Sequence, residues 1–364
     1  MDRFIAHFGS LEDPRADNAR HDLSEILFIA LAAVLCGAKN CSDMAEWGAA
    51  KQALLSKILA LPHGVPSHDT FARIFRILEP KAFEAAFRAF MAAFSEAAQI
   101  KASKGVVALD GKALRRAYDR GASHMPRVMV SAWAAEAGMT LSSLSAPDGN
   151  EAAAALQVIE LLQLKGRVVT ADALHCHRAM AKAIGARGGA YAIAVKGNQP
   201  ALLREAEAAL EAAGETAPMT TRTDRAHGRV ETRMAVVAPA PSMAERHDFP
   251  GLSAVARVES QRDGDAPVRR TFLLSEAFAP DQLLDIIRTH WSIENTLHWT
   301  LDVAMDEDAA RNRKDNAPAN LAVLRRLALN VARAHPDKKT SLRRKLLRAG
   351  WDDAFFFELV RHMR

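Results

Sequence analysis

Two short apolar segments of this chain each end in an aspartate. The first, GVVALD, ends at Asp110, and the second, GRVVTAD, ends at Asp172. Short apolar runs rich in β-branched residues are typical of strands buried in a sheet. Each acid alone has a simple explanation, since Asp110 precedes Gly111 as in a hairpin turn and Asp172 precedes a helical pattern as an N-cap. If the two strands are parallel neighbours, however, their ends meet at one edge of the sheet and the acids converge.

The segments around these acids alternate between strand and helix patterns. Strands are expected at GVVALD, RVMVSAWAA, MTLSSLSA, GRVVTAD and YAIAVKGN, and helices at GNEAAAALQVIELLQL and ALHCHRAMAKAIGARGG. The order is therefore βββαβαβ, which predicts an α/β fold. Residues 200–275 look mixed and partly strand-like. Residues 23–99, and the chain from Pro280 onward, have the three- and four-residue apolar spacing of helices.

A third acid, Glu294, lies in the helical segment LLDIIRTHWSIENTLHWTLDV. Ile287, Glu294 and Leu301 are seven residues apart, so they share one helical face, and the apolar residues around them indicate that this face is buried. A buried, unpaired carboxylate is costly, so Glu294 is expected to meet a metal, a cation or a proton. A buried ion pair with Arg288 or Lys196 explains the position equally well.

Together the three acids predict a site for a hard divalent cation. Mg²⁺, or Mn²⁺ in its place, prefers oxygen ligands and is usually held by a few carboxylates together with substrate phosphate. Two such ions roughly 4 Å apart activate the attacking oxygen and stabilise the leaving oxygen in phosphoryl transfer. We therefore expect Asp110, Asp172 and Glu294 to be catalytic, metal-binding residues, with two ions as the favoured number.

Composition indicates a globular protein without a membrane span. The 364 residues are 49% hydrophobic and 25% charged. The longest apolar run, residues 26–36, is too short to cross a bilayer, and the first ten residues lack the zones of a signal peptide. The three cysteines form no disulfide framework and suit a reducing cytosol. A cytoplasmic location, at the nucleoid if the partner is DNA, is expected.

The net charge of +5 is unevenly distributed. Residues 311–364 contain 14 Lys and Arg against 5 Asp and Glu, a net charge of +9, so residues 1–310 carry −4. Fixed positive charge of this kind binds the phosphate backbone of nucleic acids, although a solvated helix surface has the same composition. The triplet Arg343, Arg344 and Lys345 is the candidate for phosphate contact in this tail.

Other candidate DNA contacts are less specific. In VPSHDTFARIFRIL, Ser67 or Asp69 can cap a helix that exposes Arg73 and Arg76. The pattern resembles the second helix of a helix-turn-helix, but an ordinary packed helix is the favoured alternative. Further candidates, each with a plain surface role as the alternative, are Lys196 at a strand end and Arg229 and Arg233 on one face of an expected strand.

Two other groups of residues have structural explanations. His175, Cys176 and His177 are adjacent, and neighbouring helical residues point in different directions, so zinc binding by this group is not expected. Three tryptophans, Trp47, Trp291 and Trp299, are expected in the core.

Seven sequence motifs follow one another along the chain. Two are N-terminal, EDPRADNARHDLSEILFIALAAVLCGAKN and LPHGVPSHDTFARIFRILEP, and after them come, in this order, ALDGKALR, TADALHCH, YAIAVKGNQ, HGRVETR and HWSIENTLHWTLDVAMDEDAARNR. In combination they resemble the insertion-sequence transposases of the H-repeat-associated type, within the DDE superfamily. The resemblance covers nearly the whole chain. It implies a ribonuclease-H-like mixed-sheet core in which Asp110, Asp172 and Glu294 form the catalytic triad.

The resemblance also implies a domain organisation and partners. The implied parts are a helical, DNA-binding N-terminal domain over residues 1–100, the catalytic core over 101–310 with a β-rich insertion at about 200–275, and a basic helical segment over 311–364. The implied partner is double-stranded DNA, at the element's terminal inverted repeats and at the target, bound by a homodimer. Related transposases often have arginine four residues before the glutamate and lysine seven after it, but here His290 and Leu301 occupy these positions.

The leading hypothesis is a metal-dependent transposase that nicks DNA at the element's ends and transfers the freed 3′-hydroxyl to a target. One alternative is a nuclease of the same fold without transfer activity. Another is a DNA-binding remnant or regulator in which the acids no longer function. The presence of all three acids favours an enzyme.

Overall fold

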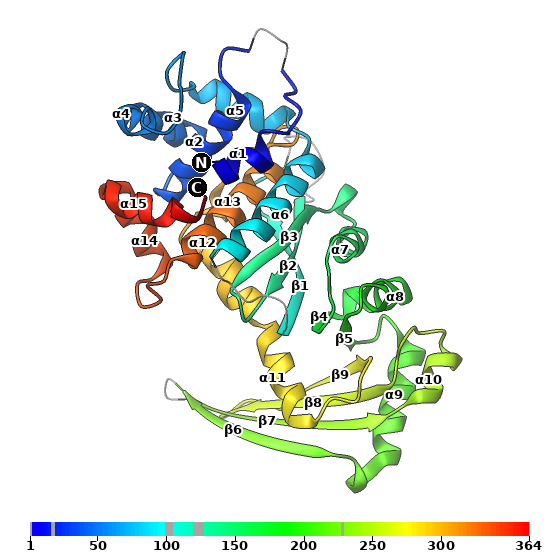
Figure 1. Cartoon of the computed structure of the whole chain (residues 1–364). Helices are drawn as coiled ribbons and strands as arrows, with labels where there is room; N and C mark the ends of the chain where they lie inside the picture. The colour runs from blue at the N-terminus through cyan, green and yellow to red at the C-terminus, as the bar shows by residue number, and fades with distance from the viewer. Residues whose placement is uncertain (1, 16–18, 99–104, 119–126, 227–228, 364) are drawn as a thin grey trace.

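The computed structural model describes residues 2–15, 19–98, 105–118, 127–226 and 229–363. Within these residues one nine-stranded sheet has the order β3-β2-β1-β4-β5-β9-β8-β7-β6. Helices from both ends of the chain gather at one end of this sheet, and strands β6 to β9 form the other end (Figure 1).

The first five strands confirm the order predicted from the sequence. They are β1 (Gly105–Leu114), β2 (Arg127–Ala134), β3 (Met139–Ser145), β4 (Arg167–Ala171) and β5 (Ala190–Val195), with α7 (Glu151–Glu160) between β3 and β4 and α8 (Arg178–Ala186) between β4 and β5. β1 is antiparallel to β2 and parallel to β4, and β5 is parallel to β4. This mixed sheet with its βββαβαβ order fits the ribonuclease-H-like core implied by the resemblance.

Residues 200–275 extend the same sheet. They form α9 (Pro200–Ala213), β6 (Met219–Ala226), β7 (Arg229–Pro239), α10 (Pro241–Arg246), β8 (Ala254–Arg262) and β9 (Val268–Leu274). β9 pairs antiparallel with β5, and β8, β7 and β6 follow as an antiparallel meander. The partly strand-like character predicted for this stretch is confirmed, and its strands continue the first five rather than forming a second sheet.

The remaining helices come from the two ends of the chain. Before the sheet are α1 (Asp2–Phe8), α2 (Leu23–Leu35), α3 (Cys41–Ala50), α4 (Gln52–Leu55), α5 (His68–Ile77) and α6 (Pro80–Ala97); after it are α11 (Pro280–His290), α12 (Trp299–Val303), α13 (Ala317–Ala334), α14 (Leu342–Trp351) and α15 (Asp353–Val360). Ser67 caps α5 as predicted, its hydroxyl accepting the N–H of Thr70.

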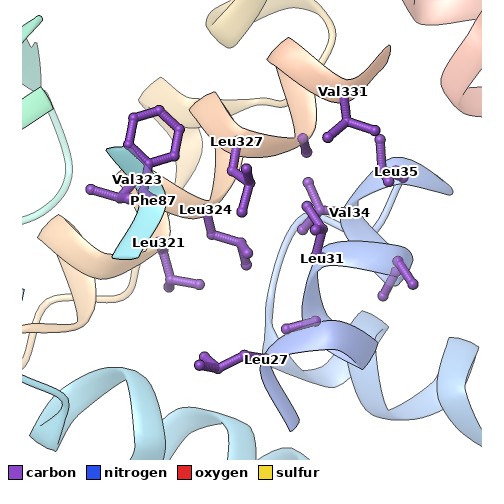
Figure 2. Close-up of a cluster of buried hydrophobic side chains, with 14 of the residues drawn as sticks. Leu27, Leu31, Val34, Leu35, Phe87, Leu321, Val323, Leu324, Leu327 and Val331 are labelled. Carbon is purple, nitrogen blue, oxygen red and sulfur yellow. The ribbon is translucent and has the colours of Figure 1, made fainter. Parts of the chain in front are cut away.

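Helix α2 is the centre of the helical end of the molecule. Twelve of its thirteen residues are buried, which is the pattern of a helix enclosed by protein on every side. Figure 2 shows Leu31 and Val34 of α2 on the side that faces Leu324 and Leu327 of α13. No helix in the described part of the chain is long and apolar enough to span a membrane.

The two ends of the chain therefore share one core. Buried residues of α1 to α6, of α13 to α15 and of one face of β1 and β2 belong to a single hydrophobic cluster. The boundary predicted at residue 100 lies outside the described residues, so the three-part division stays a prediction. The first and last of the three predicted parts are joined by packing.

The prediction of buried tryptophans is wrong at two positions. Trp47 is partly buried against Phe356, whereas Trp291 and Trp299 are 37% and 60% exposed. A π-helical segment, Ile293–His298, precedes Trp299 and rotates it away from the position that α-helical spacing predicts. Trp291 lies before that segment, at the C-cap of α11, where the guanidinium of Arg270 lies over its ring.

Candidate active site

Asp110 lies inside β1 rather than at its end, because β1 continues to Leu114 in antiparallel pairing with β2. The hairpin-turn interpretation is therefore wrong, and so is the expectation that the strand stops at the acid. What ends here is the parallel pairing with β4, whose last pair is Leu109 with Ala171. Asp110 and Asp172 each follow that last pair, so they occupy equivalent positions where the two strands separate.

Asp172 caps a short helical turn, as one interpretation predicted. Its carboxylate accepts the N–H of Leu174 at 3.0 Å at the start of the 3-10 helix Ala173–His175. The side chain is half exposed. A carboxylate has two oxygens and about four lone-pair directions, so capping leaves Asp172 free to accept a further partner.

Glu294 lies in the π-helical segment Ile293–His298, between α11 and α12. A seven-residue spacing keeps side chains on one face only while a helix has 3.6 residues per turn, and a π turn contains more. The buried positions are Ile293, Leu297 and Leu301, whereas Glu294 is exposed. The prediction of a buried Glu294 is therefore wrong. Single π turns of this kind are frequent at functional sites.

The ion pairs proposed as alternatives for Glu294 are not formed. Arg288 instead pairs with Asp224, with 2.8 Å between Nη1 and Oδ2. Across the described ranges neither Glu294 nor Lys196 takes part in an ion pair, and both are exposed. Glu294 thus has an exposed carboxylate without a cationic partner from the described residues.

The acids influence one another electrostatically. Burial, together with the negative charges of Glu294, Asp172 and Glu151, raises the pKa of Asp110 to about 7, against a backbone hydrogen bond from Gly111 that lowers it. The side chain of Asp110 is 22% exposed. Negative charge on Asp110 is therefore unfavourable unless a cation joins the site.

Glu151 is the acid that the sequence patterns did not single out. It is the first residue of α7, directly after the N-cap Asn150. Acids are common in the first helical turn because they interact favourably with the helix dipole, so nothing local marks this one as different. Glu151 comes close to Asp110 only when α7 packs across the sheet, and no sequence pattern predicts that packing.

Two neutral histidines border the acids. Nδ1 of His298 lies 3.7 Å from Oδ2 of Asp110, and Nδ1 of His290 lies 2.9 Å from Oγ1 of Thr170. Burial lowers the pKa of His290 to about 4 and that of His298 to about 3. At position 290, where related transposases often have arginine, this chain therefore has an uncharged ring.

The donor atoms suit a hard divalent cation. Carboxylate oxygens are the preferred ligands of Mg²⁺, which usually takes one or two of them and completes its shell with water and phosphate oxygens. Among the described residues no three His, Cys, Asp or Glu side chains form a complete metal-binding group. A Mg²⁺ site that depends on substrate oxygens does not require one, and the carboxylates of Glu294, Asp172 and Glu151 add negative charge around Asp110.

The candidate DNA contacts differ in accessibility. Arg73, Lys196, Arg343 and Arg344 are exposed, as is Arg76, which pairs with Asp315 at 2.7 Å. Lys345 is only 4% exposed and donates to the carbonyl of Ala332, so the prediction that it contacts phosphate is wrong. Arg233 is also largely buried, in ion pairs with Asp224 and Glu231, which is a structural role. The side chain of Arg229 lies outside the described part of the structure.

A basic cleft of about 680 Å³ lies between α5 and the segment that precedes α13. It is lined by Ala72, Arg76, Arg311, Asn312, Arg313, Lys314 and Ala317. Arg313 is held by a hydrogen bond to the carbonyl of Arg116 and by the ring of Tyr118, whereas Arg311 and Lys314 are exposed and make no ion pair with a described residue. β1 extends four residues past Asp110, or about 13 Å, toward this basic cleft.

Comparison with known proteins matches both halves of the chain. The model of the family described as "Transposase DDE domain" matches residues 101–331, and that described as "DDE_Tnp_1-associated" matches residues 5–91. YhhI of Escherichia coli, named "H repeat-associated putative transposase", is 29% identical over 97% of this chain and 96% of its own length. "Putative transposase YncI", also of Escherichia coli, is 30% identical over 94% of this chain and 90% of its own length.

Proposed function

This chain belongs to the transposase DDE family, and we propose that it cuts DNA at the ends of an insertion sequence and transfers the freed 3′-hydroxyls to target DNA. The family implies a DNA substrate and, in general, a divalent metal. In the proposal Asp110, Asp172 and Glu294 are the catalytic, metal-binding residues, two Mg²⁺ or Mn²⁺ ions are used, and two copies of the chain act together on the element's ends.

The observation that supports the proposal is the electrostatic state of Asp110. Burial and three neighbouring carboxylates raise its pKa to about 7. A structural carboxylate is normally paired with a cationic side chain, but among the described residues Asp110 has only the neutral ring of His298 in such a position, at 3.7 Å. Divalent ions bound here would supply positive charge to the scissile phosphate and lower the pKa of the attacking hydroxyl.

The chain's own residues hold the acids from three directions. β1 and β4 fix Asp110 and Asp172 at equivalent positions, and the π segment supplies Glu294. The hydrogen bond from the N–H of Leu174 restricts the carboxylate of Asp172. The hydrogen bond between Thr170 and His290 restricts the imidazole ring of His290, near Asp172. Because the two histidines are neutral, neither one competes with a metal as a positive charge.

The test is cleavage of DNA that carries both ends of the element encoding this chain. We expect nicks that leave 3′-hydroxyls at the element boundary, and joined products when target plasmid is added, with Mg²⁺ or Mn²⁺ but not with EDTA. Sequencing of the products locates the cuts. Cuts without joined products would favour the nuclease alternative, and binding without cuts would favour the remnant or regulator; either result would contradict the proposal.

DNA is proposed to be held by phosphate contacts at Arg311 and Lys314 of the basic cleft, and by Arg343 and Arg344 on α14. Each lost phosphate contact lowers the slope of log affinity against log salt concentration by about 0.9 on duplex DNA. Replacing Arg311 and Lys314 with alanine should therefore weaken binding to element-end and random duplexes alike, and flatten the slope.

The matched control for this salt titration is the double variant Lys182→Ala/Arg204→Ala. These cations are exposed on α8 and α9, away from α5 and α13. We expect the control to keep the wild-type slope. An equal effect of both double variants would contradict a localised phosphate site, and a loss confined to element-end DNA would indicate base contacts instead.

A further inference from the structure

The glycine after Asp110 marks the position of a fourth carboxylate. A β-carbon added at Gly111 would lie 2.8 Å from Oε2 of Glu151 and closer still to Oε1, so any side chain there would displace the carboxylate of Glu151 from its present position. Gly111 is part of β1 and pairs with Val130 as an ordinary strand residue. Glycine at this position therefore leaves room for the carboxylate of Glu151, which lies directly over the backbone next to Asp110.

A buried histidine points into the same cluster. His175 is 0% exposed, and neither ring nitrogen has a hydrogen-bond partner in the described structure. Its Nε2 lies 3.4 Å from Oε1 of Glu151 and 3.8 Å from Oδ1 of Asp172. The ring thus lies between one acid of the proposed triad and Glu151, at a distance from which either carboxylate can receive its N–H after a small adjustment.

The helix dipole alone does not explain the placement of Glu151. An acid that only complements the dipole is stabilised while its carboxylate stays in water. Glu151 is instead directed across β1, where its side chain is only 23% exposed and its carboxylate lies over Gly111, next to Asp110. No Lys or Arg of the described ranges pairs with it. A cation shared with Asp110 would provide the missing compensation.

We propose that Glu151 is a fourth acidic ligand of the metal site, and that His175 is the positioning residue that holds Glu151 beside Asp172. The inference rests on the proposed function, since it adds a ligand to the same site. It extends the set of acids beyond the three that the family resemblance implies. Carboxylate oxygen is the ligand type that Mg²⁺ and Mn²⁺ select, and a correctly placed extra one increases affinity.

The test measures metal binding without DNA or turnover. The full-length, metal-free protein is titrated with Mn²⁺, and free Mn²⁺ is followed by electron paramagnetic resonance. Glu151→Gln keeps the shape of the side chain and removes its charge, so we expect the dissociation constant to rise about tenfold or more. The matched control is Glu160→Gln, because Glu160 is the exposed last residue of the same helix and should leave affinity unchanged.

His175 is tested by two variants in the same titration. Loss of a residue that orients a ligand typically weakens metal affinity 10- to 100-fold, so His175→Ala should resemble Glu151→Gln. His175→Gln places an amide N–H near the position of Nε2, and we expect it to recover part of the affinity. Near-ultraviolet circular dichroism verifies that each variant is folded.

The outcomes separate this inference from the proposed function. If Glu151→Gln binds Mn²⁺ as tightly as wild type while Asp110→Asn does not, the fourth ligand is refuted and the three-acid site stands. If Asp110→Asn also binds as wild type, both proposals fail. If Glu151→Gln loses affinity but folded His175→Ala and His175→Gln do not, the positioning role of His175 is refuted.

Discussion

Replacement of Asp110 by asparagine is expected to lower the rate of DNA cleavage at least about a thousandfold. The amide has the shape of the carboxylate but no negative charge, so it is a poor ligand for Mg²⁺. Bound metal contributes several kcal/mol to stabilising charge in a phosphoryl-transfer transition state, and each 1.4 kcal/mol corresponds to a factor of ten. Initial rates on element-end DNA at saturating Mg²⁺ measure the effect.

The control for this variant is Asp263→Asn, which makes the same chemical change at an exposed position between β8 and β9. It should keep the wild-type rate. Cleavage by Asp110→Asn at more than about a tenth of the wild-type rate, with contaminating nuclease removed, would exclude the catalytic role of Asp110.

Asp110→Asn should not be less stable than wild type, so a loss of cleavage by this variant would not be due to unfolding. Burial raises the pKa of Asp110 to about 7, so between about pH 4 and pH 7 the folded chain keeps a proton that the unfolded chain has lost. The unfolding free energy of metal-free wild type therefore falls, relative to that of Asp110→Asn, as the pH rises through this range. Above pH 7 the variant should be more stable by up to a few kcal/mol, at about 1.4 kcal/mol per pKa unit. Urea unfolding at pH 4 and pH 8 measures the difference, and a less stable variant at pH 8 would contradict it.

The order of the first five strands could be predicted because each strand has its own apolar pattern. The end of β1 could not. Asp110 followed by glycine is a strong local turn signal, yet β1 continues because residues 111–114 pair with residues of β2 that lie 13 to 19 positions further along the chain. Pairing partners of this kind are chosen by tertiary packing, which overrides local propensity. The space that the glycine leaves open is occupied by the carboxylate of Glu151, from another element.

The three acids could be selected from the sequence, but their environments could not. Glu294 was predicted to be buried because a seven-residue spacing assumes a regular α-helix, and the π segment breaks that assumption. The positive charge of the tail led to the prediction that Lys345 faces DNA. The apolar face of α14 packs on α13, however, and Lys345 lies on that face and is buried. A charge count gives the composition of a segment but not the direction in which each side chain points, so it does not distinguish exposed Arg344 from buried Lys345.

A buried ion pair supports the strand that lies behind Asp110. Arg326 of α13 and Glu307 are both fully buried, with 2.9 Å between Nη1 and Oε1. Arg326 also donates from Nε to the hydroxyl of Ser131, at 3.1 Å, and Ser131 is the β2 residue paired with Asp110. The pair thus connects the C-terminal helices to the part of the sheet that contains Asp110.

Replacing Arg326 with methionine is expected to lower the unfolding free energy by about 3–5 kcal/mol, because it removes the ion-pair partner of the buried Glu307 carboxylate. Urea unfolding followed by circular dichroism measures the loss. Lys39→Met is the control, since Lys39 pairs with the adjacent Asp306 at the surface, where such a pair contributes less than about 1 kcal/mol. The double variant Arg326→Met/Glu307→Met removes both charges and should recover most of the stability, as buried pairs replaced by apolar residues often do. A double variant as unstable as the single one would show that the loss comes from packing around the guanidinium and not from the isolated charge.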